Sequence, residues 1–122
     1  TSMMTQVFMN LIKNAVEAME QEARPDKQYR LDLRVRQLQR GEQFYVVAEV
    51  ADNGPGIPQE IRDRIFEFGF STKDQSKAGR GYGLHSCKDT VKKYGGLIEI
   101  ESEIGQGTTF RVLLPTSKPG TT

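Results

Sequence analysis

Two groups of polar residues are spaced so that their side chains could bind a polar, charged ligand together. Asn10 and Asn14 stand four residues apart in a segment with helical apolar spacing, so their amides project from the same side of one helix. Asp52 is followed by Gly54 and Gly56, and glycines allow a backbone to turn tightly and to approach a ligand closely. Each pattern alone also has an ordinary structural explanation. The asparagines could be capping or solvent-facing amides, and the Asp52 segment could be only a tight turn.

A third group is the glycine run at 79, 81 and 83, which precedes a second segment of helical spacing. Glycines expose backbone amides, and a helix N-terminus attracts anions, so this run is typical of phosphate binding. The same residues could equally form a flexible hinge. The spacing is not that of a dinucleotide-binding fingerprint, and the run lacks the Gly-Lys-Ser/Thr of a Walker loop.

Composition excludes several classes of function. The 122 residues carry a net charge of +1, which gives no basic surface for nucleic acid or anionic lipid. With a single cysteine, the chain cannot form an internal disulfide. With one cysteine and one histidine, it has too few ligands for a metal site built from thiolates and imidazoles. No apolar run approaches the roughly 20 residues that span a bilayer. We therefore expect a cytoplasmic domain, and leave open that its parent protein is anchored in the inner membrane.

Periodicity predicts an α+β domain. Helical spacing covers 5–21 and 82–94, and a short helix is expected after Pro58. Alternation predicts a half-buried strand with Tyr29, Leu31, Leu33 and Val35 on one side, and further strands at 44–51, 98–101 and 110–114, the last ended by Pro115. Hairpins with helices gathered on one face give a two-layer α/β sandwich. We expect one domain over 1–122, with a short cloning remnant at 1–5 and a frayed tail at 116–122.

Taken together and in order, these segments resemble the GHKL ATPases. Residues 6–19, with Asn10 and Asn14, resemble the asparagine-containing N box, and 52–58 resembles the G1 box. Residues 65–73 are similar to the F box, and 79–84 to the G2 box. The closing segment 105–115 resembles the final hairpin of the catalytic domains of sensor histidine kinases. The likeness covers the chain from about residue 6 to residue 115.

The resemblance implies a Bergerat fold, with a mixed and mostly antiparallel sheet covered on one face by helices, and a site for ATP and Mg²⁺. Asp52 would accept a hydrogen bond from the adenine amino group, and Thr108 would support the adenine through water. Asn14 would give an amide oxygen to the metal, with Asn10 beside the metal and the terminal phosphate. The nucleotide-binding set implied is Asn14, Asp52, Gly54, Gly56, Ile57, Lys73, Gly79, Arg80, Gly81, Tyr82, Gly83, Leu84 and Thr108.

By the same resemblance, residues 69–83 would form a lid over the phosphates. Lys73 and Arg80 would supply mobile positive charge, and Lys73 joins Asn10 and Asn14 as a catalytic candidate. The aromatic residues before and within this segment would anchor it on the core, namely Phe66, Phe68 and Phe70. The chain departs from many family members at Glu17, where a basic residue is usual, so phosphate neutralisation could shift to Lys73 or Arg80.

Position 10 separates branches of the family. Hydrolytic members have a glutamate at the place of Asn10, and an amide cannot act as a general base near neutral pH. We therefore expect slow ATP hydrolysis and a kinase that passes the γ-phosphate to a histidine in a two-component system. His85 lacks the context of a phosphoaccepting histidine, so the acceptor would lie on a helical dimerisation domain absent from this chain, and a response regulator would be only an indirect partner.

Three alternatives stay open on sequence alone. The chain could be a nucleotide-sensing module without catalysis, an anti-sigma-type protein-serine kinase, or a fragment of a hydrolase. A transfer assay, the architecture of the parent protein and the turnover rate distinguish them. The sequence does not reveal the signal that is sensed.

Overall fold

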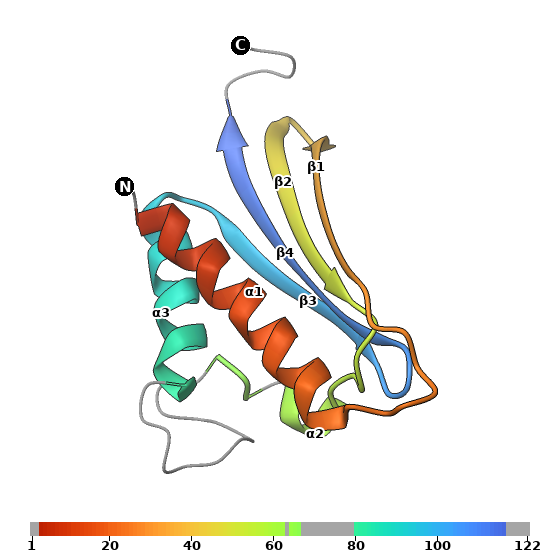
Figure 1. Ribbon diagram of the computed structural model, residues 1–122. Helices are drawn as coiled ribbons and strands as arrows, with labels where there is room; N and C mark the ends of the chain where they lie inside the picture. The colour runs from red at the N-terminus through yellow and green to blue at the C-terminus, as the bar shows by residue number, and fades with distance from the viewer. Residues whose placement is uncertain (1–2, 63, 67–79, 117–122) are drawn as a thin grey trace.

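The computed structural model describes residues 3–62, 64–66 and 80–116. Helix α1 (Met3–Glu22) comes first, followed by the hairpin of β1 (Leu31–Arg40) and β2 (Gln43–Asp52). The short helix α2 (Gln59–Arg62) and helix α3 (Arg80–Lys93) precede a second hairpin, β3 (Leu97–Glu103) and β4 (Gly107–Thr116). Figure 1 shows this order from the N-terminus to the C-terminus. The expected element order is confirmed, and the residues expected to be a cloning remnant include 3–5, which belong to α1.

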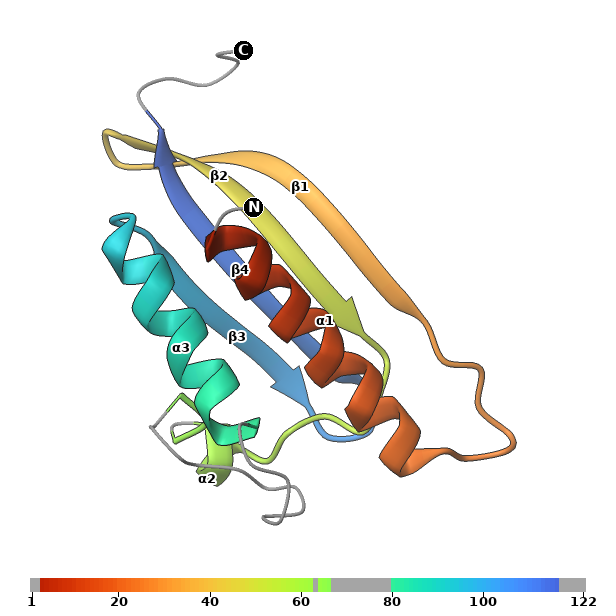
Figure 2. The ribbon, with the colours of Figure 1, turned by 60° about the vertical axis from the view of Figure 1, so that its left-hand side comes forward.

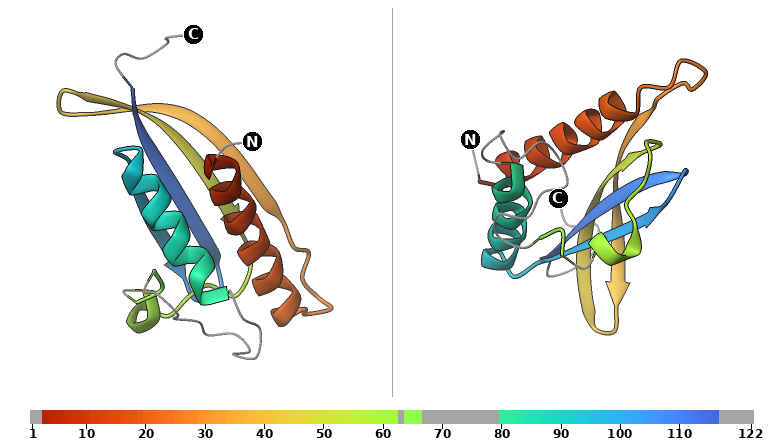
Figure 3. Two further views of the ribbon diagram at one scale, coloured as in Figure 1. Left: turned by 90° about the vertical axis from the view of Figure 1, so that its left-hand side faces the viewer. Right: turned by 90° about the horizontal axis from the view of Figure 1, so that it is seen from below.

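The four strands form one sheet in the order β1-β2-β4-β3, and each pairing among them is antiparallel. Helices α1 and α3 lie side by side on one face, α1 over β2 and α3 over β3. Figures 2 and 3 show the helices as one layer and the twisted sheet as the other. The predicted two-layer α/β sandwich is therefore confirmed.

The core lies between the layers. Val7, Leu11 and Ala15 stand four residues apart on α1 and are at most 3% exposed, as expected for one face of an amphipathic helix. Helix α3 contributes a matching apolar stripe, and alternate residues of the central strands β2 and β4 close the core from below. Other buried residues of this core are Val50, Leu84, Cys87, Val91, Phe110 and Val112.

Strand β1 corrects one expectation, because the side chains of Leu33 and Val35 are 60% and 75% exposed rather than half-buried. Their strand partners Val50 and Ala48 face the helical layer. Strand β1 is an edge strand, and in Figure 2 it lies beyond α1. Only Leu31, at the start of the strand, packs against the core. The alternation identified a strand, but burial also requires a covering element.

Pro115 does not end the last strand, which continues to Thr116. The pairing of β4 with β3 stops at Leu113, so only β2 flanks β4 at this level, where Pro115 lies opposite Tyr45. A proline has no N–H to donate, so it is tolerated in a strand where one side has no neighbouring strand to accept that hydrogen bond. Helical spacing also predicts Tyr94 on the apolar stripe of the helix expected over 82–94, but Tyr94 lies just after α3 and is 48% exposed.

Helix α3 starts at Arg80, so Gly81 and Gly83 lie in its first turn rather than in a loop. The first backbone N–H groups of a helix have no partner within the helix, so these glycines keep the amides for which they were singled out. Gly95, which has a positive φ of 76°, lies in the turn that ends the helix. The amide of Gly96 donates to the carbonyl of Val91 in the turn that follows.

Candidate functional site

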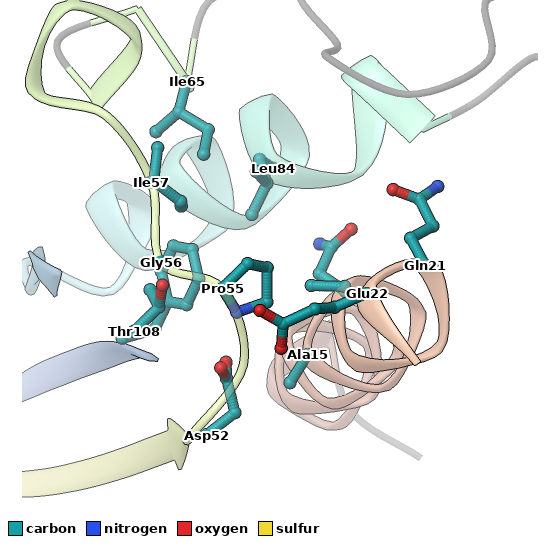
Figure 4. Close-up of a pocket in the computed structure, with 13 residues that line it drawn as sticks. Ala15, Gln21, Glu22, Asp52, Pro55, Gly56, Ile57, Ile65, Leu84 and Thr108 are labelled. Atoms are coloured by element: carbon teal, nitrogen blue, oxygen red, sulfur yellow. The ribbon is translucent and has the colours of Figure 1, made fainter. Parts of the chain in front are cut away.

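A cavity of about 340 Å³ opens between α1, the segment after β2 and the start of α3. Figure 4 shows side chains from these elements converging on it. The lining residues are Asn14, Ala15, Ala18, Gln21, Glu22, Asp52, Pro55, Gly56, Ile57, Ile65, Leu84, Thr108 and Phe110. Six of them belong to the nucleotide-binding set expected from sequence: Asn14, Asp52, Gly56, Ile57, Leu84 and Thr108.

Asp52 is the last residue of β2, and the chain turns away from the sheet directly after it. Its carboxylate oxygen Oδ1 accepts a hydrogen bond from the amide of Gly54 at 2.8 Å, which fixes the side chain through its own turn. A Cβ at Gly54 would stand 2.9 Å from that oxygen and 3.3 Å from Cγ of Met19 on α1. Glycine is therefore required here to keep the turn close to both the aspartate and the helix.

The β3–β4 hairpin holds the other side of this turn. Gly56 has a φ of 81°, and a Cβ there would collide with the carbonyl oxygen of Glu103. The amide of Gly105 donates to the carbonyl of Pro55 at 2.9 Å. The backbone beside the cavity is thus clamped by a hairpin about 50 residues away in sequence.

Thr108 lies directly opposite Asp52 in the pairing of β2 with β4, so both side chains are on the helix-facing side of the sheet. The Thr108 hydroxyl is 2.8 Å from the Ser102 hydroxyl. Ser102 donates its proton to the Gly107 carbonyl and accepts the amide of Ile57. Thr108 therefore donates to Ser102, and its own oxygen keeps acceptor capacity at the cavity wall.

Asn14 reaches the same cavity from α1. It is followed at four-residue steps by Ala18 and Glu22, which also line the cavity, so one edge of the helix forms a wall. Asn14 and Glu22 are eight residues apart, and eight residues of helix span about 12 Å. They therefore lie at opposite ends of this wall. The carboxylate at 52 and the amide at 14 thus share one cavity, as the resemblance required.

Asn10 is not among the residues that line this cavity. One turn before Asn14, its side chain hydrogen-bonds the buried Cys87 thiol of α3. Burial raises the pKa of Cys87 to about 11, and the hydrogen bond from Asn10 opposes part of that rise. The thiol therefore stays protonated and unreactive at neutral pH. The role of Asn10 beside a metal stays a prediction.

Several expected site residues fall at or beyond the limits of the description. Lys73, Gly79, Phe68 and Phe70 lie outside the described residues, and for Arg80 and Tyr82 only the helical backbone is described. Phe66 packs edge-to-face on Phe110 of the core, with ring centroids 6.2 Å apart, and its anchoring of residues 69–83 stays a prediction.

Sequence reasoning missed seven lining residues, which come from α1, from the segments after β2 and α2, and from β4: Ala15, Ala18, Gln21, Glu22, Pro55, Ile65 and Phe110. Two of these could have been found, because Ala18 and Glu22 follow Asn14 at helical steps along the same edge. Pro55, Ile65 and Phe110 contribute apolar surface, and nothing in their spacing distinguishes them from core residues.

Among the described residues, no group of three or more His, Cys, Asp or Glu side chains could hold a metal. A cation in this cavity would instead take oxygen from amides, water and its own ligand, which suits Mg²⁺ bound together with phosphates. In the described part of the chain, no helix has the length and apolar character to cross a membrane.

The chain is similar to known sensor kinases. The chain is 39% identical over 121 residues to the sensor kinase CckA of Brucella abortus, covering 90% of this chain and 12% of that protein. It is 37% identical to the sensory histidine kinase/phosphatase NtrB of Rhizobium leguminosarum, covering 94% of this chain and 30% of the relative. The chain therefore spans less than a third of these two relatives.

Two solved structures share the fold. The catalytic domain of the histidine kinase ThkA matches with a TM-score of 0.71 at 29% identity, over 93% of this chain and 66% of that one. Full-length ShkA, in complex with AMPPNP, matches with a TM-score of 0.74 at 29% identity, over 93% of this chain and 21% of that one. A family model described as histidine kinase-, DNA gyrase B- and HSP90-like ATPase matches residues 1–118, and the chain belongs to this family.

Proposed function

We propose that this domain binds Mg²⁺-ATP in the cavity and passes the γ-phosphate to a histidine on a helical domain outside the chain. One observation carries the proposal: Asp52 and Asn14, 38 residues apart in sequence, line the same cavity. An acid suited to a purine amino group and an amide suited to Mg²⁺ then face one ligand. The relatives with the same family domain are sensor histidine kinases.

Asp52 defines the adenine end. Its carboxylate is oriented by the Gly54 amide and stands across the strand pair from Thr108. A carboxylate accepts from the exocyclic amino group of adenine and would repel the carbonyl oxygen of guanine. Ala15, Ala18, Ile57 and Phe110 supply apolar surface for the flat faces of the base. This end would therefore select adenine.

Asn14 defines the phosphate end. Its amide oxygen would hold Mg²⁺ when the nucleotide is bound, and the cation would neutralise charge on the phosphates. The first-turn amides of α3, including those of Gly81 and Gly83, would donate to phosphate oxygens. Lys73 and Arg80 remain candidates for additional positive charge.

Transfer is favoured over hydrolysis because position 10 is an asparagine. An amide cannot take a proton from water at neutral pH, and Asn10 contacts Cys87 rather than lining the cavity. Within this proposal the domain contributes positioning and electrostatics, which are the main sources of rate in phosphoryl transfer. The isolated domain should accordingly bind ATP and turn it over slowly.

The test is calorimetric titration of the domain with AMPPNP, with and without Mg²⁺. We expect Asp52→Asn to abolish measurable binding with an unchanged fold, and Asn14→Asp to alter chiefly the effect of Mg²⁺. Asp89→Asn, which changes an exposed carboxylate on α3, serves as the matched control. Unchanged affinity in Asp52→Asn would remove the proposal.

A second assay addresses the acceptor. The domain is incubated with ATP labelled at the γ-phosphate and a separate dimerisation domain of a relative such as NtrB. Label in an acid-labile, base-stable bond on the added domain supports a histidine kinase. Label in an acid-stable bond on serine would favour the anti-sigma-type alternative, and binding without transfer would favour a nucleotide sensor.

A further inference from the structure

A small polar cluster stands at the C-terminal end of α1, next to the turn that carries Asp52. Lys27 donates to Oε1 of Glu22 at 2.9 Å and to the carbonyl of Gly54 at 3.3 Å. The hydroxyl of Tyr29 donates to the same Glu22 oxygen at 2.8 Å. The side chains of Lys27 and Glu22 are only 17% and 18% exposed. One carboxylate is thus held by two donors at the edge of the cavity.

The connection between α1 and β1 is also joined to the Asp52 turn through Asn53. The Asn53 side chain accepts the amide of Arg30 at 2.7 Å and donates to the carbonyl of Gln28 at 2.9 Å. Together with the contact from Lys27 to Gly54, these bonds fix the turn relative to the end of α1. Glu22 and Asp52 are therefore held in a set relation to each other.

Glu22 lines the cavity, and Figure 4 shows its carboxylate pointing from α1 toward Pro55 and Asp52. Both hydrogen bonds that the described residues make to this carboxylate end on Oε1. The second oxygen, Oε2, consequently has acceptor capacity for a ligand. The hydrogen bonds from Lys27 and then Tyr29 lower the pKa of Glu22, so the carboxylate is ionised near neutral pH.

We propose that Glu22 is a specificity-determining residue that accepts the second N–H of the purine amino group, while Asp52 accepts the first. The inference rests on the proposed binding of ATP. An exocyclic amino group carries two hydrogens, and two carboxylates at the same end of one cavity can take one each. Lys27 and Tyr29 are positioning residues, because they hold Glu22 toward the cavity and offset the charge of the second carboxylate.

Three features support a ligand role over a purely structural one. The site is at the adenine end, since Lys27 bridges Glu22 and the carbonyl of Gly54. Two acids near one another raise each other's pKa unless cations or donors stabilise them, and here Lys27 and Tyr29 both donate to Glu22. Negative charge is unfavourable at a helix C-terminus, so Glu22 does not stabilise the end of α1 by its charge. A purely structural carboxylate would also have no reason to face the cavity.

The test compares ATP with N6-methyl-ATP, which retains one amino hydrogen, by titration of four proteins. In the starting domain we expect methylation to weaken binding about tenfold, the effect of losing one hydrogen bond to a charged group. Glu22→Gln should lower ATP affinity about tenfold and reduce the penalty for methylation to about twofold or less. Lys27→Met should reduce that penalty to a few fold, because Glu22 loses one of its two donors.

Glu20→Gln is the matched control, because it removes the same charge from an exposed position on the same helix. It should leave both affinities unchanged. An equal weakening of both nucleotides by Glu22→Gln, or a methylation penalty that stays the same, would overturn the inference. Absence of ATP binding by the starting domain would instead overturn the proposed function, so the two failures are distinguishable. Melting temperatures measured without ligand confirm that each variant is folded.

Discussion

Two carboxylates on β2, three residues apart, lie on opposite faces of the sheet and have opposite surroundings. Glu49 is 6% exposed on the open face, where its carboxylate is 2.6 Å from Arg111 and 3.3 Å from Arg36. Arg34 approaches it at 3.8 Å. Asp52, on the helix-covered face, is oriented by a backbone amide and lines the cavity.

Comparing Glu49 with Asp52 shows how the surroundings of a carboxylate decide whether it holds the sheet together or is available to a ligand. Glu49 sits in a row that crosses the sheet from Arg34 through Arg111 to Glu99, so its acceptor capacity is used by fixed cations. Asp52 sits where the strand ends and the layers part. We infer that the open face stabilises the sheet and the covered face binds the ligand.

The largest expected effect is on binding. Asp52→Asn should weaken ATP binding on the order of 100-fold or more, since a charged acceptor is lost and an amide donor faces the purine amino group. Glu49→Gln should leave the affinity unchanged. Parallel titrations of both variants check this, and equal effects on binding would contradict the division between the two faces.

The reverse order is expected for stability. Glu49→Gln should lower the free energy of unfolding by about 2 kcal/mol, because charge-assisted hydrogen bonds to partly exposed arginines are lost. Asp52→Asn should change it by less than about 1 kcal/mol. Urea denaturation with circular dichroism measures both values, with Glu42→Gln, an exposed position in the β1–β2 turn, as the control.

Acid should remove the same stabilisation. Hydrogen bonds from Arg111 and then Arg36 hold the pKa of Glu49 below its ordinary value of 4.5. The contribution of Glu49 is therefore complete above pH 4.5 and is lost as the pH falls through the lower pKa of the folded state. Denaturation midpoints between pH 7 and pH 3 should fall less steeply for Glu49→Gln than for the starting protein.

A smaller effect is expected at Thr108. Thr108→Val keeps the shape of the side chain and removes the hydroxyl that meets Ser102 and the cavity. Loss of one neutral hydrogen bond should weaken ATP binding about fivefold. Thr109→Val, on the opposite face of the same strand, should leave affinity unchanged, and a similar loss there would argue against a direct role for Thr108.

The smallest effect is expected on β1. Val35 is 75% exposed, so Val35→Thr should change the free energy of unfolding by less than about 0.5 kcal/mol. Val50→Thr, at a buried position on the same face of the sheet, should lower it by about 2 kcal/mol because a hydroxyl is buried. Comparable losses in the two variants would show that Val35 is covered in solution.

The sequence by itself predicted the element order and six of the thirteen residues that line the cavity. Local rules were sufficient for these: helical spacing placed Asn14 on α1, and glycines marked the turn after Asp52. The strand that holds Leu33 and Val35 was identified, but its burial was not, because alternation cannot show whether a helix lies above an edge strand.

Only the tertiary structure decided which polar groups face the cavity and which face one another. Glu49 and Asp52 look alike in sequence, and their roles differ because the arginine on β4 lies beside one and the cavity beside the other. Helical spacing could have placed Glu22 on the edge of α1 that carries Asn14, but the contact of Lys27 with the carbonyl of Gly54, 27 residues away, was set by chain packing. Periodicity fixes the side of an element on which a residue lies, whereas its neighbours depend on how distant segments pack.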